Sequence, residues 1–215
     1  IENCNVTCGL NSGGLIGYCK TGATVSNCYV SGNIKGGGYN ASNAGVGGLA
    51  GLANATSLTN CYSTADVSVE GSDAKGNYLA GGLVGGSPNS AITITNCFAT
   101  GNISATGNGC NVGGLAGNKI GNITNSYATG NVTATAASYG YAGGLVGSTN
   151  GSITNCFATG DVSFKCVGSN SGQQPAGGLV GQSAAGNITN SYATGDVSCK
   201  GSVLNIAGGL AGSFG

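Results

Sequence analysis

Residues 143–162 read GGLVGSTNGSITNCFATGDV, and this stretch contains the two short blocks from which the chain is built. The first block is Gly-Gly-Leu-x-Gly, whose leucine here is Leu145. The second block has Asn155 near its centre and reads x-[Ile/Leu/Val]-[Thr/Ser]-Asn-[Cys/Ser]-[Tyr/Phe]-x-[Thr/Ser]-[Gly/Ala]-[Asn/Asp]-[Val/Ile]. Because the two blocks alternate along the chain, the sequence is best read as an array of repeats.

The Gly-Gly-Leu-x-Gly block recurs at intervals of 30 to 34 residues along the 215-residue chain. Its leucines are Leu15, Leu49, Leu83, Leu115, Leu145, Leu179 and Leu210. The asparagine of the second block falls at Asn27, Asn60, Asn96, Asn125, Asn155 and Asn190, and Asn3 opens a decayed copy, Ile1-Glu2-Asn3-Cys4. The alternation predicts one repeat domain over residues 1–215, with about six coils.

The number and spacing of the glycines indicate the secondary-structure class. The chain has 45 glycines, and each glycine inside a helix costs about 1 kcal/mol. The segments between glycines are short and rich in Thr, Val, Ile, Tyr and Phe, which favour strands. We therefore expect an all-β fold, a β-solenoid (β-helix) with about 30–36 residues per coil and coils stacked at about 4.8 Å.

Side-chain alternation along a strand assigns the predicted faces. With Ile123 inside, Thr124 points out, Asn125 in, Ser126 out and Tyr127 in. The predicted core ladder therefore joins the leucine column to a stacked aromatic column. The aromatic residues are Tyr29, Tyr62, Phe98, Tyr127, Phe157 and Tyr192.

Two positions leave alternatives open. The repeated asparagine either points inward and bonds to the asparagines above and below it, or lies at a corner because it tolerates left-handed dihedrals. In the glycine block, Gly143 and Gly147 leave room for Leu145 to reach across a narrow core. Ala142, Gly144 and Val146 would then form an outward strip of small residues that packs against another rod, unless a corner reverses the faces.

Composition excludes several classes of function. The chain has no His, its formal net charge is zero, and only 6% of its residues are charged. It therefore lacks the residues for Ser-His-Asp catalysis, for His-ligated metal and for a basic nucleic-acid surface. We predict no enzyme activity, no catalytic residue, no metal and no cofactor. The apolar runs are too short to span a membrane, no signal peptide opens the chain, and the start at Ile1 suggests a mature or truncated product.

The Gly-Gly-Leu-Val-Gly blocks at 81–85, 143–147 and 177–181, each followed by an Ile-Thr-Asn-Ser-Tyr-Ala-Thr-Gly type strand, resemble the GLUG-motif repeat. The resemblance covers nearly all of the chain. This family is known from secreted and surface-attached proteins, often large adhesin-like ones, and from some bacterial immunoglobulin-cleaving proteases. There the repeat is a scaffold or stalk without catalytic residues, so the resemblance implies an extracellular structural or adhesive role.

The many cysteines depart from the simple repeat and favour an oxidising compartment. The disulfide candidates are Cys4, Cys8, Cys19, Cys28, Cys61, Cys97, Cys110, Cys156, Cys166 and Cys199. Cys4, Cys28, Cys61, Cys97 and Cys156 are assigned to one repeat column, with Ser126 and Ser191 in its other copies. Coil spacing permits Cys4–Cys28 or Cys28–Cys61, and Cys61–Cys97, as rungs. Cys166 and Cys199 make the best single pair, but the connectivity is open.

Asn-x-Ser/Thr sequons suggest a glycan-coated rod if the source has a secretory route that glycosylates. The candidates are Asn5, Asn40, Asn54, Asn102, Asn122, Asn131, Asn150 and Asn187. Asp66, Asp161 and Asp196 share a column with Asn33, Asn102 and Asn131. We interpret this column as solvated rather than as a calcium site, which needs six to eight oxygens.

The chain ends suggest self-association, because Leu210 lies nearly in phase with the Ile1 of a following copy. The leading hypothesis is an extracellular or cell-surface fibre or stalk, built by head-to-tail stacking and carrying disulfides and glycans. Its expected partner is itself, with no nucleic acid and no membrane span. The alternative is an adhesin or binding module of a larger surface protein. An ice-binding face over Thr59, Thr95, Thr124, Thr154 and Thr189 is a weaker hypothesis.

Overall fold

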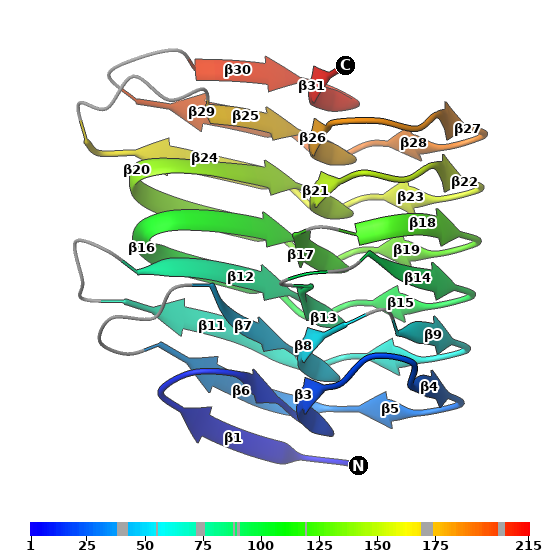
Figure 1. Ribbon diagram of the computed structural model, residues 1–215. Helices are drawn as coiled ribbons and strands as arrows, with labels where there is room; N and C mark the ends of the chain where they lie inside the picture. Colours follow the sequence, from blue (N-terminus) through cyan, green and yellow to red (C-terminus); the bar gives the residue numbers. More distant parts are fainter. Residues whose placement is uncertain are drawn as a thin grey trace.

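The fold is an all-β solenoid whose coils stack from the N-terminus to the C-terminus (Figure 1). The computed structural model describes residues 1–37, 43–54, 56–71, 76–87, 89, 91–118, 120–168, 174–201 and 205–215. Across these residues, no helix has the length and apolar character that crossing a membrane requires. Asn40, one of the predicted glycosylation sites, lies outside the described residues.

The described residues form three parallel sheets that run along the stack. The first sheet contains β1 (Cys4–Cys8), β2 (Ser12–Gly13), β6 (Gly32–Gly36), β7 (Ala44–Gly47), β11 (Asp66–Glu70), β12 (Asn77–Gly81), β16 (Ile103–Gly113), β20 (Val132–Gly143), β24 (Val162–Cys166), β25 (Gln174–Gly177), β29 (Val197–Lys200) and β30 (Asn205–Gly208).

The second sheet contains β3 (Ile16–Cys19), β4 (Thr24–Ser26), β8 (Ala50–Ala53), β9 (Ser57–Thr59), β13 (Val84–Gly86), β14 (Ile92–Thr95), β17 (Ala116–Asn118), β18 (Ile120–Thr124), β21 (Val146–Thr149), β22 (Ile153–Thr154), β26 (Val180–Ser183), β27 (Ile188–Thr189) and β31 (Ala211–Phe214). The third contains β5 (Tyr29–Val30), β10 (Tyr62–Ser63), β15 (Phe98–Ala99), β19 (Tyr127–Ala128), β23 (Phe157–Ala158) and β28 (Tyr192–Ala193).

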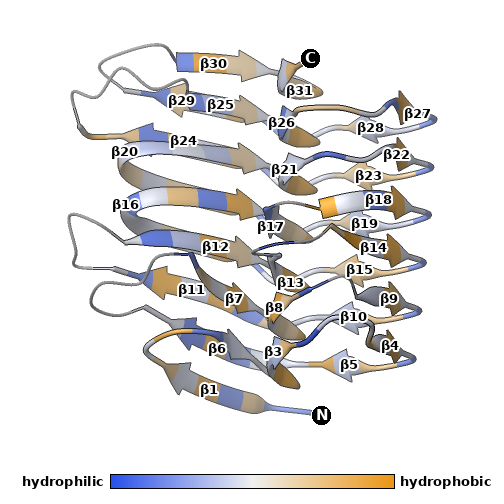
Figure 2. Cartoon of the chain, in the orientation of Figure 1, coloured by the Kyte–Doolittle hydropathy of each residue, from blue (hydrophilic) through white to orange (hydrophobic). Residues whose placement is uncertain are grey.

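The repeat period in the sequence is the coil period in the structure. Val132 pairs in register with Ile103 on one side and with Val162 on the other, as equivalent positions of successive repeats should. Hydrophobic and hydrophilic residues share single strands (Figure 2), and β11 buries its two valines while its ends stay exposed. The predicted solenoid is therefore confirmed, with each repeat forming one coil.

The leucine column lies in the core, as expected. Leu49, Leu83, Leu115, Leu145 and Leu179 are fully buried. Leu15 and Leu210 are each 39% exposed, because they belong to the first and last coils and have a neighbour on one side only.

The aromatic half of the predicted core ladder was wrong, because the alternation of faces breaks at the asparagine. Asn125 has φ 50°, in the left-handed region, and is exposed. A left-handed residue turns the chain through a corner and resets which side chains point inward. Ser126 is thus buried, and Tyr127 lies on the outer surface, half-buried. The same corner recurs in all six full repeats, with φ between 48° and 54°.

The glycine block is a tight arch, so the outward strip of small residues was also wrong. Ala142, Gly144 and Val146 are buried. A Cβ on Gly147 would lie 2.4 Å from the Gly117 carbonyl oxygen and 2.8 Å from the Val112 nitrogen. Glycine is needed here because neighbouring backbones approach without room for a side chain.

The N-terminal residues lie in a different register from the one predicted. Cys4 pairs with Gly32 and Asn5 with Asn33, so Cys4 does not belong to the cysteine column. The Ile1 amino group donates to the Tyr29 carbonyl, whereas the Gly215 N–H donates to the Ser183 carbonyl. The Ser31 N–H also donates to the Ile1 carbonyl, so Ile1 lies opposite Val30. The predicted near-phase continuation from Leu210 to a following Ile1 was therefore wrong.

Candidate functional site

A ladder of asparagine amides runs along the outer corner of the rod. Each Nδ2 donates to the Oδ1 of the asparagine one coil nearer the N-terminus, over 3.1 to 3.3 Å. The ladder joins Asn27, Asn60, Asn96, Asn125, Asn155 and Asn190. The corner alternative is therefore confirmed, and the hydrogen-bonded ladder of the other alternative forms as well, although that alternative placed it inside the rod. The asparagine side chain points outward.

The aromatic column forms a second outer ladder beside the first. Consecutive ring centroids are 4.7 to 5.3 Å apart and the ring planes differ by 1° to 7°. Tyr29 and Tyr192, at the two ends, are 37% and 53% exposed. The stack adds contact between coils without contributing to the interior.

The Asn/Asp column holds adjacent coils together through backbone groups. Oδ1 of Asp66 accepts the Asn102 N–H at 2.8 Å, and Oδ1 of Asn102 accepts the Asn131 N–H at 3.0 Å. The pattern continues through Asp161 to the Asp196 N–H. Because only one oxygen is used, Asn and Asp serve equally at this position. These side chains are exposed, as the solvated interpretation expects.

The structure sorts the predicted glycosylation sites by exposure. Asn5, Asn102, Asn122, Asn131, Asn150 and Asn187 are exposed. Asn54 is only 7% exposed, and its Nδ2 donates to the Tyr18 hydroxyl at 3.3 Å while its Oδ1 accepts from Ser87. Because the Asn54 side chain is buried and hydrogen-bonded, a glycan has no room at this residue in the folded chain. Asn54 was therefore wrong as a predicted glycosylation site.

Cysteine and serine share one buried column because they make the same hydrogen bonds. The Cys97 thiol donates to the Thr95 carbonyl at 3.2 Å, and the Ser126 hydroxyl donates to the Thr124 carbonyl at 2.8 Å. Each also accepts from the preceding coil: Cys97 Sγ from the Cys61 N–H at 3.4 Å, and Ser126 Oγ from the Cys97 N–H at 3.1 Å. These bonds close the inner side of each asparagine corner.

All ten cysteines lie among the described residues, and all are unpaired thiols in this structure. Cys199 pairs with Phe164, so Cys166 is its diagonal neighbour, two residues along the strand. Diagonal neighbours are about 7–8 Å apart, beyond the usual disulfide range. Cys166–Cys199 is therefore not the best pair. At Cys110, burial raises the pKa of the thiol to about 12.

The hydrogen-bonding role of the column predicts how Cys97 tolerates substitution. Cys97→Ser should change the free energy of unfolding by less than about 0.5 kcal/mol, because serine keeps both bonds. Cys97→Val should lower it by about 2 kcal/mol, because the Cys61 N–H loses its acceptor in a buried site. Urea denaturation under reducing conditions measures both. Equal losses for the two variants would contradict this role.

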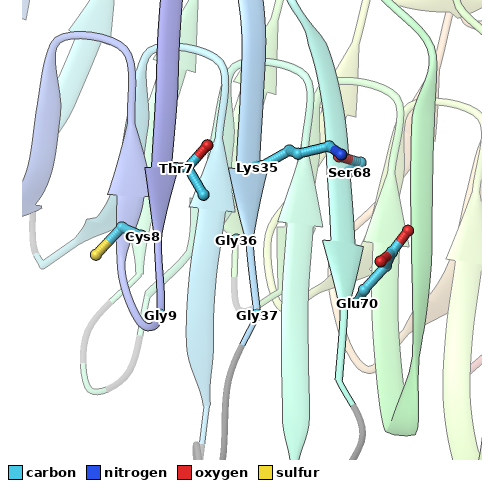
Figure 3. A pocket seen from close by; sticks show the side chains of 8 residues that line it. All are labelled: Thr7, Cys8, Gly9, Lys35, Gly36, Gly37, Ser68 and Glu70. Carbon is cyan, nitrogen blue, oxygen red and sulfur yellow. The ribbon is translucent and has the colours of Figure 1, made fainter.

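A shallow groove opens on the outer face of β1, β6 and β11, with a volume of about 380 Å³ (Figure 3). It is lined by Thr7, Cys8, Gly9, Lys35, Gly36, Gly37, Ser68 and Glu70. The Lys35 side chain extends toward Ser68, whereas Cys8 and Glu70 project separately from their own strands. The thiol, the ammonium and the carboxylate do not converge, so the groove presents polar surface rather than a set of cooperating catalytic groups.

Comparison with known families identifies the repeat from which these ladders are built. The GLUG motif matches five segments, residues 42–68, 76–104, 108–133, 138–163 and 175–198. Searches of curated proteins and of solved structures found no match. The five segments cover more than half of the sequence and follow successive coils of the solenoid. The chain therefore belongs to the GLUG-motif family.

Proposed function

We propose that this chain is a structural rod that acts outside the cell or at its surface, as a fibre or a stalk. The observation that carries the proposal is the continuity of the ladders. Six asparagines and six aromatic rings connect successive coils without a break. Each ladder resists separation of the coils, and together with the parallel sheets they make bending and local opening costly.

Low charge supports the stacking of coils, and exposed sequons support the extracellular part of the proposal. The net charge is zero, so stacked coils carry little self-repulsion. Six sequon asparagines are exposed and would carry glycans on the outside of the rod. Glycans would also keep neighbouring rods from associating through their flat faces.

The fibre form of the proposal takes a second copy of this chain as its partner. Among the described strands, β29 and β30 at one end, and β1 and β2 at the other, each have a neighbour on one side only. Leu210 and Phe214 are 39% and 55% exposed at the C-terminal end. Parallel pairing of β29 with β1 and of β30 with β2 would cover these edges and continue the sheet. The register of Ile1 leaves β27 without a neighbour in such a contact.

Edge prolines test this contact. The Gly208 carbonyl faces β25, so the N–H of Ala207 points away from the stack. By the same alternation the Thr7 N–H points away from β6. Ala207→Pro and Thr7→Pro should each reduce fibres to single rods in negative-stain electron microscopy and sedimentation velocity. The control variants Ala207→Val and Thr7→Val keep the N–H and should leave the fibres intact.

Single rods of the unmodified chain at every concentration would overturn the fibre form and favour the stalk form. Fibres that survive both proline variants would show that copies associate in some other way. The rods themselves should be about 30 Å long, from about six coils at strand spacing.

An ice-binding face is the second candidate, because the outward threonines are in register. Thr124 pairs with Thr95 on one side and Thr154 on the other, and Thr154 pairs with Thr189. Exposed Asn122 and Asn187 lie two residues away on the same face, where glycans would cover the array. Thermal hysteresis of the purified chain, measured with and without enzymatic removal of glycans, decides this candidate.

A further inference from the structure

Three cysteines occupy consecutive coils of the buried column. Tyr62 pairs with Tyr29 on one side and Phe98 on the other, and each of these residues directly follows a cysteine. Cys28, Cys61 and Cys97 therefore lie one above another, at the strand spacing of about 4.8 Å. This separation lies within the Cα range that a disulfide accepts. Ser126 occupies the next coil and ends the run.

The three thiols also contact one another. Hydrogen bonds from the thiol of Cys97 and from the backbone and thiol of Cys28 lower the pKa of Cys61, against the effect of burial. The contact with Cys61, together with burial, raises the pKa of Cys97. Cys61 thus lies between two thiols, one in the coil before it and one in the coil after it.

Solvent reaches only one member of the run. Cys61 and Cys97 are 0% and 1% exposed, whereas Cys28 is partly exposed in the first full corner. A dissolved reagent must therefore meet Cys28 first.

We propose that Cys28 and Cys61 form a thiol–disulfide exchange site for small aliphatic disulfides, with Cys97 as a neighbour that stays reduced. The Cys28 thiolate attacks one sulfur of the small disulfide, whose S–S bond breaks and releases one thiolate. The Cys61 thiolate then attacks Cys28 Sγ in the mixed disulfide and releases the second thiolate. The two cysteine protons pass to the released thiolates, so two protein thiols are oxidised and one small disulfide is reduced to two thiols.

Because Cys61 lies between the other two, it can bond to only one of them at a time. The disulfide remains at Cys28–Cys61, since the Cys97 thiol is 1% exposed and is held by hydrogen bonds to the Leu58 and Thr95 carbonyls, which makes it a poor nucleophile for displacing Cys28. The oxidised rod then has its first two full corners linked covalently, while Cys97 keeps its hydrogen bonds.

Lysine positions make the test direct. Cleavage after lysine places Cys28 on fragment 21–35, Cys61 on fragment 36–75 and Cys97, with Cys110, on fragment 76–119. The folded, reduced chain is treated with oxidised glutathione, its remaining thiols are alkylated, and the unfolded chain is digested and analysed by mass spectrometry without reduction. The proposal expects fragment 21–35 linked to 36–75. No link, or a dominant link between 36–75 and 76–119, would overturn it.

Serine variants separate the roles, and they should fold because Ser126 and Ser191 already occupy the column. Cys28→Ser should slow the loss of the Cys61 thiol at least about tenfold, because the accessible nucleophile is gone. Cys97→Ser should leave the rate and the 21–35 to 36–75 link unchanged. An unchanged rate in Cys28→Ser, or loss of the link in Cys97→Ser, would contradict the proposal.

Discussion

Replacing Gly178 with alanine is expected to lower the free energy of unfolding by about 3 kcal/mol, the cost of overpacking a well-filled interior. A Cβ at this position would lie 2.1 Å from the Gly209 carbonyl oxygen and 2.9 Å from Ala193 Cβ. The first of these atoms belongs to the backbone of the next coil, so it cannot move aside without breaking the Gly178 to Gly208 hydrogen bond of the sheet. Urea denaturation followed by far-ultraviolet circular dichroism measures the change.

Gly209→Ala is the matched control, because Gly209 is the same residue of the next Gly-Gly-Leu block. No atom lies within 4 Å of a Cβ built there, since Gly209 belongs to the last coil. Its substitution should change stability by less than about 0.5 kcal/mol. Equal losses for both variants would mean that glycine is needed for its own backbone conformation and not for the close approach of coils.

The repeat period, the strand class and the leucine core could be predicted because each is repeated seven times in the same form. Leucine is the one large apolar residue that every copy of the block holds, since the next position varies between alanine, valine and isoleucine, so the leucine column could be assigned to the interior. Neither the choice of strand nor the position of the leucines depends on how the chain turns between blocks.

The faces of the second block could not be predicted from alternation, because alternation assumes an unbroken strand. The left-handed Asn125 divides the block into β18 and β19 and exchanges the inner and outer sides after it. The sequence contained one signal for this: cysteine and serine replace each other at the following position. Both are small hydrogen-bonding residues, as a corner closed from inside requires.

The terminal register and the burial of Asn54 depend on contacts that no repeat pattern records. Asn3 resembles the repeated asparagine and even has φ 52°, yet it faces Ser31 and not Asn27. Asn54 has the sequon of its exposed counterparts, but its side chain is enclosed by Ser87 and Tyr18 from neighbouring coils. The outward Asn102 and Asn131 were predicted correctly because each directly precedes a strand, β16 or β20, and no left-handed corner separates it from the inward residue that follows.

Replacing Asn125 with alanine is expected to lower the free energy of unfolding by about 2 kcal/mol, from two separable causes. About 1 kcal/mol comes from holding a residue with a Cβ in the left-handed region that asparagine tolerates. The remainder comes from the two ladder bonds, to Asn96 and from Asn155, at 3.1 Å each. Asn125→Gly removes the bonds but keeps the corner, so it should lose about half as much. The same urea titration measures both variants. If glycine lost as much as alanine, the corner conformation would contribute nothing, and the ladder alone would explain why asparagine recurs in every coil.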